Sequence, residues 1–310
     1  MKGLLTLPHD LLCRFEVLGK CFNASIGLIP VKIYFPRYQE KIDPAGRAQI
    51  GISNELIPPE IAKNWSRGNE PLEWGWPVTY PDKDASVRLI ALTYECDKSQ
   101  EEEIAQYLYN EWEPWIESFF SFCDLASKQH SNRDRNLLNH SSEMELLSKD
   151  GYIKREQTHT IHCYFSSKDQ MLTSSQIEGA IAFASSKKEL KIEYQLLLSA
   201  YSSRRNCHNK HAIMDACAAV EICLNKVIQA FATTKDFDPN VLTQKYRTLG
   251  DKFKLIKTID NHFPDVNEKQ IVDLRNDVAH CRKITVSDEE TDKLIDSVEL
   301  CLAYCSPEYY

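Results

Sequence analysis

The character of the sequence changes near residue 172, and this change limits the possible architectures more than any other feature. Before it, short runs of β-branched and aromatic residues are separated by turn-forming clusters such as DPAG and IPPE. After it, apolar residues recur every three or four positions, as in amphipathic helices. The sequence therefore predicts an α+β domain with an antiparallel sheet at 1–172 and an all-α helical bundle at 173–310.

The N-terminal region combines strand-like and helix-like segments. Strands are expected at 12–18, 27–35, 86–96 and 151–165. A helix is expected to begin after Ser99, because serine is a good N-cap and the three glutamates that follow suit a first turn. Pro114 should bend or break this helix, since proline has no amide hydrogen. The polar stretch 127–150 predicts a long loop, an insertion or part of a linker.

The C-terminal region reads as helix almost throughout. The expected helices cover 176–204, with a break at Ser185-Ser186, then 209–232, 241–258, 266–282 and 288–304. The second of these carries an apolar stripe suited to packing in a bundle: Ile213, Cys217, Val220, Leu224, Val227 and Phe231. The last begins with Ser287 and three acidic residues, which predicts a capped start.

Composition excludes several classes of protein. None of the 310 residues lie in a run approaching roughly 18 apolar residues, so we expect no membrane helix and a soluble, cytoplasmic protein. The 11 cysteines include no Cys-x-x-Cys pair, which favours reduced, mostly buried thiols over a zinc site. The net charge of −8 argues against non-specific coating of nucleic acid. Residues 187–284, however, hold 17 Lys or Arg against 12 Asp or Glu, which allows local contact with a polyanion.

The segment LRNDVAH, residues 274–280, carries the side chains best suited to chemistry. Arg275 is followed at once by Asn276, and His280 comes five positions after the arginine. Many helices contain an arginine and a histidine at this spacing by chance, so the neighbouring segments decide its weight. Here AIMDACAAVEICLNKVI and then TLGDKFKLI precede the motif.

This order of segments resembles that of HEPN domains, helical bundles in which an Ala-rich helix with an embedded glutamate, here Glu221, precedes an Arg-polar-x-x-x-His motif. The resemblance covers about residues 185–305. It implies a HEPN-like bundle, a homodimer formed through the C-terminal domain, and metal-independent cleavage of RNA by Arg275, Asn276 and His280. By analogy with HEPN ribonucleases, it also implies a role in prokaryotic antiviral defence or as a toxin, with a sensing or regulatory N-terminal domain. Some HEPN domains only dimerise or bind partners, so a non-catalytic interaction module is the alternative.

The motif residues also suit RNA cleavage on chemical grounds. Attack by the 2′-hydroxyl needs a proton carrier, and histidine, whose ordinary pKa is about 6.5, works near neutral pH. An arginine is always charged and grips two phosphate oxygens. The Asn276 amide would orient the phosphate or the histidine. This chemistry needs no metal or other cofactor, and no paired carboxylates stand here to hold a metal.

Helix geometry limits how Arg275 and His280 act together. Five residues at about 100° each place their side chains roughly 140° apart around a regular helix. Either the arginine lies at a helix start with local distortion, or two copies of the chain build the site across a two-fold axis. In a purely structural interpretation, His280 is satisfied near a helix end. Arg275 then pairs with one of three carboxylates: Asp273, Asp277 or Glu221.

Other clusters are weaker candidates. In THTIHC, His159 and Cys163 would share one face of a strand without His162, which disfavours a metal site. A small basic cluster is expected to be a solvated face or a contact to a phosphate backbone: Arg204, Arg205, His208, Lys210 and His211. Four tryptophans suit either base stacking or, more often, a core: Trp74, Trp76, Trp112 and Trp115.

Overall fold

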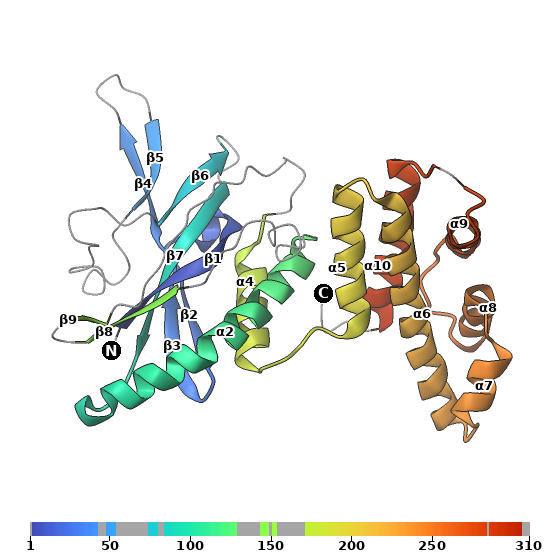
Figure 1. Cartoon of the computed structure of the whole chain (residues 1–310), viewed down its shortest axis with the longest axis horizontal. Helices are drawn as coiled ribbons and strands as arrows, with labels where there is room; N and C mark the ends of the chain where they lie inside the picture. The colour runs from blue at the N-terminus through green and yellow to red at the C-terminus, as the bar shows by residue number, and fades with distance from the viewer. Residues whose placement is uncertain are drawn as a thin grey trace. The chain divides into compact units, whose positions relative to one another are not determined.

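The computed structural model (Figure 1) describes residues 2–42, 48–53, 74–79, 84–128, 143–148, 151–153, 171–283 and 285–305. The chain divides into two compact units, which we call the sheet unit (1–127 and 134–189) and the helical unit (128–133 and 190–310). An antiparallel sheet near the N-terminus and a helical C-terminal region confirm the coarse division into α+β and all-α parts.

Among the described residues, the main sheet has seven strands, and every pairing is antiparallel. The strands are β1 (Lys2–Arg14), β2 (Cys21–Ile26), β3 (Ile29–Tyr34), β6 (Gly75–Thr79), β7 (Asp84–Tyr94), β8 (Glu143–Ser148) and β9 (Gly151–Ile153). Their order is β2-β3-β7-β1-β8-β9, and β6 also pairs with β7. A separate two-stranded sheet joins β4 (Arg37–Ile42) to β5 (Ala48–Ser53).

The central strands β1 and β7 are buried on both faces, as near-continuous apolar runs predict. Neighbours that point to opposite faces, such as Leu4 and Leu5, are both buried. The strand expected at 12–18 actually begins at Lys2 and ends at Arg14, and Phe15–Val17 form a short 3-10 helix, η1. The sequence does not predict the early part of β1, because Pro8 interrupts the strand pattern. The pairing of β1 with β7 shifts register between Thr6 and Leu11, where a proline is tolerated.

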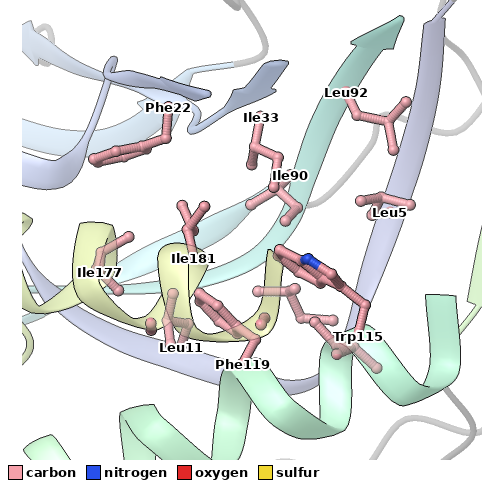
Figure 2. Close-up of a cluster of buried hydrophobic side chains, with 14 of the residues drawn as sticks. Leu5, Leu11, Phe22, Ile33, Ile90, Leu92, Trp115, Phe119, Ile177 and Ile181 are labelled. Atoms are coloured by element: carbon pink, nitrogen blue, oxygen red, sulfur yellow. The ribbon is translucent and has the colours of Figure 1, made fainter. Parts of the chain in front are cut away.

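Two helices cover one face of this sheet, α2 (Glu101–Ala126) and α4 (Ser174–Ser185). In Figure 2, Trp115 and Phe119 of α2 and Ile181 of α4 point toward the strands that carry Leu5 and Ile90. Trp112, Trp115 and Phe119 stack along α2, with ring centroids 5.5 and 5.4 Å apart.

Two details of α2 differ from the expectation. Ser99 is not the N-cap: Lys98–Gln100 form a short 3-10 helix, η2, and Gln100 occupies the cap position without a side-chain bond. The three glutamates do fill the first turn. Pro114 does not end the helix, which continues to Ala126. Pro114 lies on the exposed side, while Trp112 and Trp115 are buried, and burial of such side chains outweighs the missing hydrogen bond.

The boundary between the units follows Glu189, not residue 172. Helix α4 therefore belongs to the sheet unit, where Ile177 and Ile181 are part of the core. A capping box starts it, in which Thr173 accepts from the Gln176 amide and the Gln176 side chain accepts from the Thr173 amide. The break expected at Ser185-Ser186 is present, and here it separates the two units.

The polar stretch 127–150 is not without structure, because it contains β8. The strand expected at 151–165 is present as β9 over its first three residues. The rest of that segment, with His159, His162 and Cys163, lies outside the described residues.

The helical unit contains α5 (Ile192–Arg205), α6 (Asn209–Thr234), α7 (Pro239–Lys245), α8 (Leu249–Ile259), α9 (Glu268–Ala279) and α10 (Asp288–Cys305). Helix α6 is the central element, packing against each of the other five (Figure 1). The helix expected at 241–258 is two helices, since Thr248 caps α8 by accepting from the Asp251 amide at 3.2 Å.

Two further expectations concern α10 and the cysteines. The capped start at Ser287 is confirmed: Ser287 Oγ accepts from the Glu290 amide at 3.2 Å, and the Glu290 carboxylate accepts in return from the Ser287 amide at 3.1 Å. The expectation of reduced thiols is wrong for one pair, because a disulfide joins Cys223 of α6 to Cys305 of α10. The two residues are 82 positions apart, so no local spacing indicates the pairing.

Candidate functional site around the Arg275 helix

Helix α9 carries the motif and is fixed at its start by a side-chain cap. Asn267 Oδ1 accepts from the Gln270 amide at 3.1 Å. Its apolar face, with Ile271, Leu274 and Val278, is buried in the helical unit. The motif thus lies on a helix whose position is set by packing.

The end of α9 is a Schellman turn that places His280 at the C-cap. The Cys281 amide donates to the Val278 carbonyl at 3.1 Å, and the Arg282 amide donates to the Asp277 carbonyl at 2.8 Å. Cys281 has φ +52°, the left-handed conformation that such a turn requires and that glycine usually supplies. His280 is therefore the last residue before the chain turns away, and its side chain is exposed.

Arg275 lies within α9, not at its start, so local distortion at a helix start is not how this site is built. Its side chain is half-buried, and Nη1 donates to Asn276 Oδ1 at 3.2 Å. In the described parts of the chain, no carboxylate lies within ion-pair distance of this guanidinium. The Asn276 side chain thus accepts a hydrogen bond from the arginine that precedes it.

The Glu221 carboxylate, which the sequence offers as a partner for Arg275, pairs with a lysine of α8. Lys252 Nζ donates to Glu221 Oε1, and the lysine is only 4% exposed. One turn before Glu221 on α6 lies the buried Cys217. Burial raises the pKa of the Cys217 thiol to about 12, while the Arg275 guanidinium lowers it and Glu221 raises it further. Cys217 thus lies within electrostatic reach of both Arg275 and Glu221.

The sequence analysis did not single out Lys252, which pairs with Glu221. A signal was present: Leu249, Phe253 and Ile256 form the buried stripe of α8, and Lys252 falls on the same side of the helix. A lysine in an apolar stripe needs a buried partner, and its partner lies 31 residues earlier in the chain.

The side chains of Arg275 and His280 in one chain point in different directions. Arg275 lies in regular helix and His280 at the C-cap of the same helix, so their side chains leave the axis roughly 140° apart. One copy of the chain therefore presents the two groups on different sides of α9.

The other candidates are structural or solvated. Trp74, Trp112 and Trp115 are buried, which confirms the core interpretation for these three. His208 and His211 are exposed and pack edge to face, with ring centroids 6.0 Å apart.

Arg204, which belongs to the same basic cluster, forms ion pairs with acidic residues of α10. Its Nε donates to Asp292 at 2.7 Å, and Nη1 lies 3.2 Å from Asp288. These contacts raise the pKa of Arg204 further, chiefly through the hydrogen bond to Asp292. Within the described ranges, no three His, Cys, Asp or Glu side chains gather as metal ligands would.

Comparisons of the chain with protein-family models, with curated proteins and with solved structures found no match. Within the described residues, α6 is the one helix long and apolar enough to cross a membrane. Length and composition alone are weak indications, and α6 packs against helices on several sides, as the core helix of a soluble protein does.

Proposed function

We propose that this protein is a metal-independent endoribonuclease whose active site combines Arg275 and His280 from two copies of the chain. The observation that carries the proposal is the state of these two side chains. His280 is exposed at the end of α9, and Arg275 has no carboxylate partner among the described residues. A purely structural pair would be covered and ion-paired. Because the two side chains diverge around one helix, a second copy related by a two-fold axis is the simplest source of the missing half.

In the proposed reaction, a 2′-hydroxyl of the RNA attacks the adjacent phosphorus. The bond between the 2′-oxygen and phosphorus forms and the bond to the 5′-oxygen of the next nucleotide breaks, leaving a 2′,3′-cyclic phosphate and a 5′-hydroxyl. His280 takes the proton from the 2′-hydroxyl, and water protonates the leaving 5′-oxygen; the histidine then returns its proton to the hydroxide that is left. Arg275, held by Asn276, stabilises the charge that develops on the phosphate.

The direct test is cleavage of mixed RNA by the purified dimer in excess EDTA. We expect His280→Ala and Arg275→Ala each to lower the rate by about 100-fold or more. Matched controls are His262→Ala and Arg247→Ala, exposed residues of the same unit outside the cluster. Activity that survives both motif substitutions contradicts the proposal. Absence of cleavage by an intact wild-type dimer favours the alternative, a non-catalytic dimerisation module.

Subunit mixing tests the composite arrangement. In a mixed dimer of Arg275→Ala and His280→Ala chains, one of the two sites keeps both groups if the site spans two copies. After random exchange, about a quarter of the wild-type activity should return. If each chain builds its own site, mixing restores nothing.

The wider role that we propose rests on the resemblance to HEPN ribonucleases and not on these residues. It is cleavage of RNA in the cytoplasm, in antiviral defence or as a toxin, with the sheet unit sensing a signal or regulating the nuclease.

A further inference from the structure

The end of α10 is attached to three other segments of the helical unit. Cys305, the last residue of the helix, forms the disulfide with Cys223 of α6. The Tyr304 hydroxyl donates to the Asp260 carboxylate, just after α8. The Tyr194 hydroxyl of α5 donates at 3.1 Å to a backbone carbonyl in the last turn of α10. Two of these three attachments are hydrogen bonds, so α10 keeps its place when the disulfide is absent.

The two sulfur atoms of this disulfide differ in their access to solvent. Cys223 is 2% exposed and lies in the middle of α6, whereas Cys305 is half-buried at the end of α10. A dissolved thiol therefore reaches the bond from the Cys305 side. A thiolate attacks the sulfur that it can approach, so Cys305 is the attacked atom and Cys223 the leaving one.

The surroundings of Cys223 also accommodate the reduced state. Its Sγ lies 3.8 Å from the carbonyl oxygen of Cys301, so a Cys223 thiol has an acceptor for its hydrogen. Cys301 itself, one turn before Cys305, is fully buried, and burial raises the pKa of its thiol to about 12. The Cys301 thiol is therefore protonated near neutral pH and does not compete with Cys305 for the bond to Cys223.

We propose that Cys223 and Cys305 form a thiol–disulfide exchange site for low-molecular-weight thiols of the glutathione class, which open and close the bond between α6 and α10 from the Cys305 side. A glutathione thiolate attacks Cys305 Sγ, the bond between the two cysteine sulfurs breaks, and its electron pair goes to Cys223, which takes up a proton. A second glutathione thiolate attacks the glutathione sulfur of the mixed disulfide and expels the Cys305 thiolate, which is then protonated. The products are two cysteine thiols and one glutathione disulfide, and glutathione disulfide drives the same steps in reverse. This site is independent of the proposed ribonuclease reaction.

The first test equilibrates the full chain with mixtures of reduced and oxidised glutathione near neutral pH, then blocks free thiols and maps each cysteine by peptide mass spectrometry. Cys223 and Cys305 should change together from a disulfide to two thiols as the share of reduced glutathione rises. The exposed Cys281 should instead carry glutathione in the oxidised mixtures, and the buried Cys301 should stay free of it. A Cys223–Cys305 bond that fails to form in oxidised glutathione, or that reduced glutathione leaves intact, overturns the proposal.

Two single substitutions test the direction of attack. In Cys223→Ser, oxidised glutathione should leave a stable mixed disulfide on Cys305, because no second thiol is there to expel it. In Cys305→Ser, the folded protein should protect Cys223, with at least about tenfold less modification. Both variants lose the same bond, so a difference between them does not come from lost stability. Equal modification at the two positions overturns attack from the Cys305 side.

The effect of opening the bond is measured on the folded protein. Reduction should lower the melting temperature of the wild-type helical unit by about 10 °C and leave that of Cys223→Ser unchanged. Amide hydrogen exchange should accelerate most in the last turn of α10, while the helical signal in circular dichroism stays. An unchanged wild-type melting temperature, or loss of the helical signal on reduction, contradicts a local bond that opens within an intact fold.

Discussion

The two units of this chain treat buried charge differently. In the sheet unit, the core between the sheet and its two helices is aliphatic and aromatic, and among the described residues of this unit Asp124, at the end of α2, is the buried charged one. In the helical unit, Glu193 is 2% exposed and Lys252 is 4% exposed, and each has a partner of opposite charge. Ion pairs of this kind add little stability over apolar packing, but they fix which groups lie next to each other. The helical unit, which contains these buried ion-paired residues, also carries the candidate site.

The largest effect should come from the core of the sheet unit. Trp115→Ala removes a side chain that is 4% exposed and stacked on Phe119, which should cost about 3–5 kcal/mol of unfolding free energy. Hydrogen exchange should then accelerate in β1 and β7 but not in α6. Glu113→Ala, on the exposed side of the same helix, should change stability by about 0.5 kcal/mol or less. Equal acceleration in both units would show one cooperative structure and break the comparison.

The next effect should come from a buried charge of the helical unit. Lys226 Nζ lies 2.7 Å from both Glu193 oxygens, so Lys226→Met leaves a buried carboxylate unpaired. Because Lys226 is itself half-exposed, we expect a loss of about 2 kcal/mol in urea unfolding. Adding Glu193→Gln should recover most of it.

The exposed pair Lys293–Glu289, at 2.6 Å, provides the control for that substitution. Lys293→Met should leave the urea unfolding midpoint almost unchanged, since both side chains are mostly in water. If both lysine substitutions cost the same, burial is not what separates the two kinds of pair.

A gain in stability is expected at helix ends of the helical unit. Among the described residues, glycine has positive φ in turns of the sheet unit, after η1 and between β2 and β3. Non-glycine residues have it after helices of both units, such as Lys187 after α4 (φ 51°) and Cys281 after α9 (φ 52°). Cys281→Gly should raise the unfolding free energy by about 1 kcal/mol, because glycine adopts this conformation without steric cost. Cys281→Ala keeps the strain and should give no gain. Urea unfolding of both variants checks the sign.

The smallest effect should be the pH dependence of a surface pair. The hydrogen bond from Lys283, with those from Ser287, lowers the pKa of Glu290 from 4.5 to about 2. A lowered pKa in the folded state adds stability that is present above pH 4.5 and is lost as the pH falls toward 2. The Glu290 side chain is 39% exposed, so solvent screens the pair and the contribution should be below about 0.5 kcal/mol. Glu290→Gln should make the urea unfolding midpoint depend less on pH between 4.5 and about 2. An unchanged pH dependence would contradict the assignment.

Local features of the fold were predictable from the sequence. The long apolar stripe of α6, the glutamates at the start of α2 and the capping box at Ser287 each depend on residues within one or two turns. The position of His280 near a helix end follows in the same way. The Schellman turn itself was harder, because Cys281 occupies the place where glycine would have marked it.

Pairings between distant segments were not predictable. Lys252 and Glu221 are 31 residues apart, and Cys223 and Cys305 are 82 apart. A buried lysine predicts that some carboxylate approaches it but not which one, and the sequence offered Glu221 as one of three possible partners for Arg275. For the same reason α4 was assigned to the wrong unit. Its helical pattern predicts a buried face but not the segment against which that face packs.

The closure of the sheet unit by α4 affects how the protein is made on the ribosome. Leu172 bonds with β1 at both its amide and its carbonyl, 3.1 Å to Leu12 and 2.9 Å from Arg14, and α4 follows directly. At about 5–20 residues per second, the ribosome needs roughly 3–12 s to extend the chain from the end of α2 to the end of α4. Throughout that interval the apolar faces of β1 and α2 lack their last covering helix. The nascent chain should therefore be most in need of chaperones during those seconds, before residues 190–310 of the helical unit have been translated.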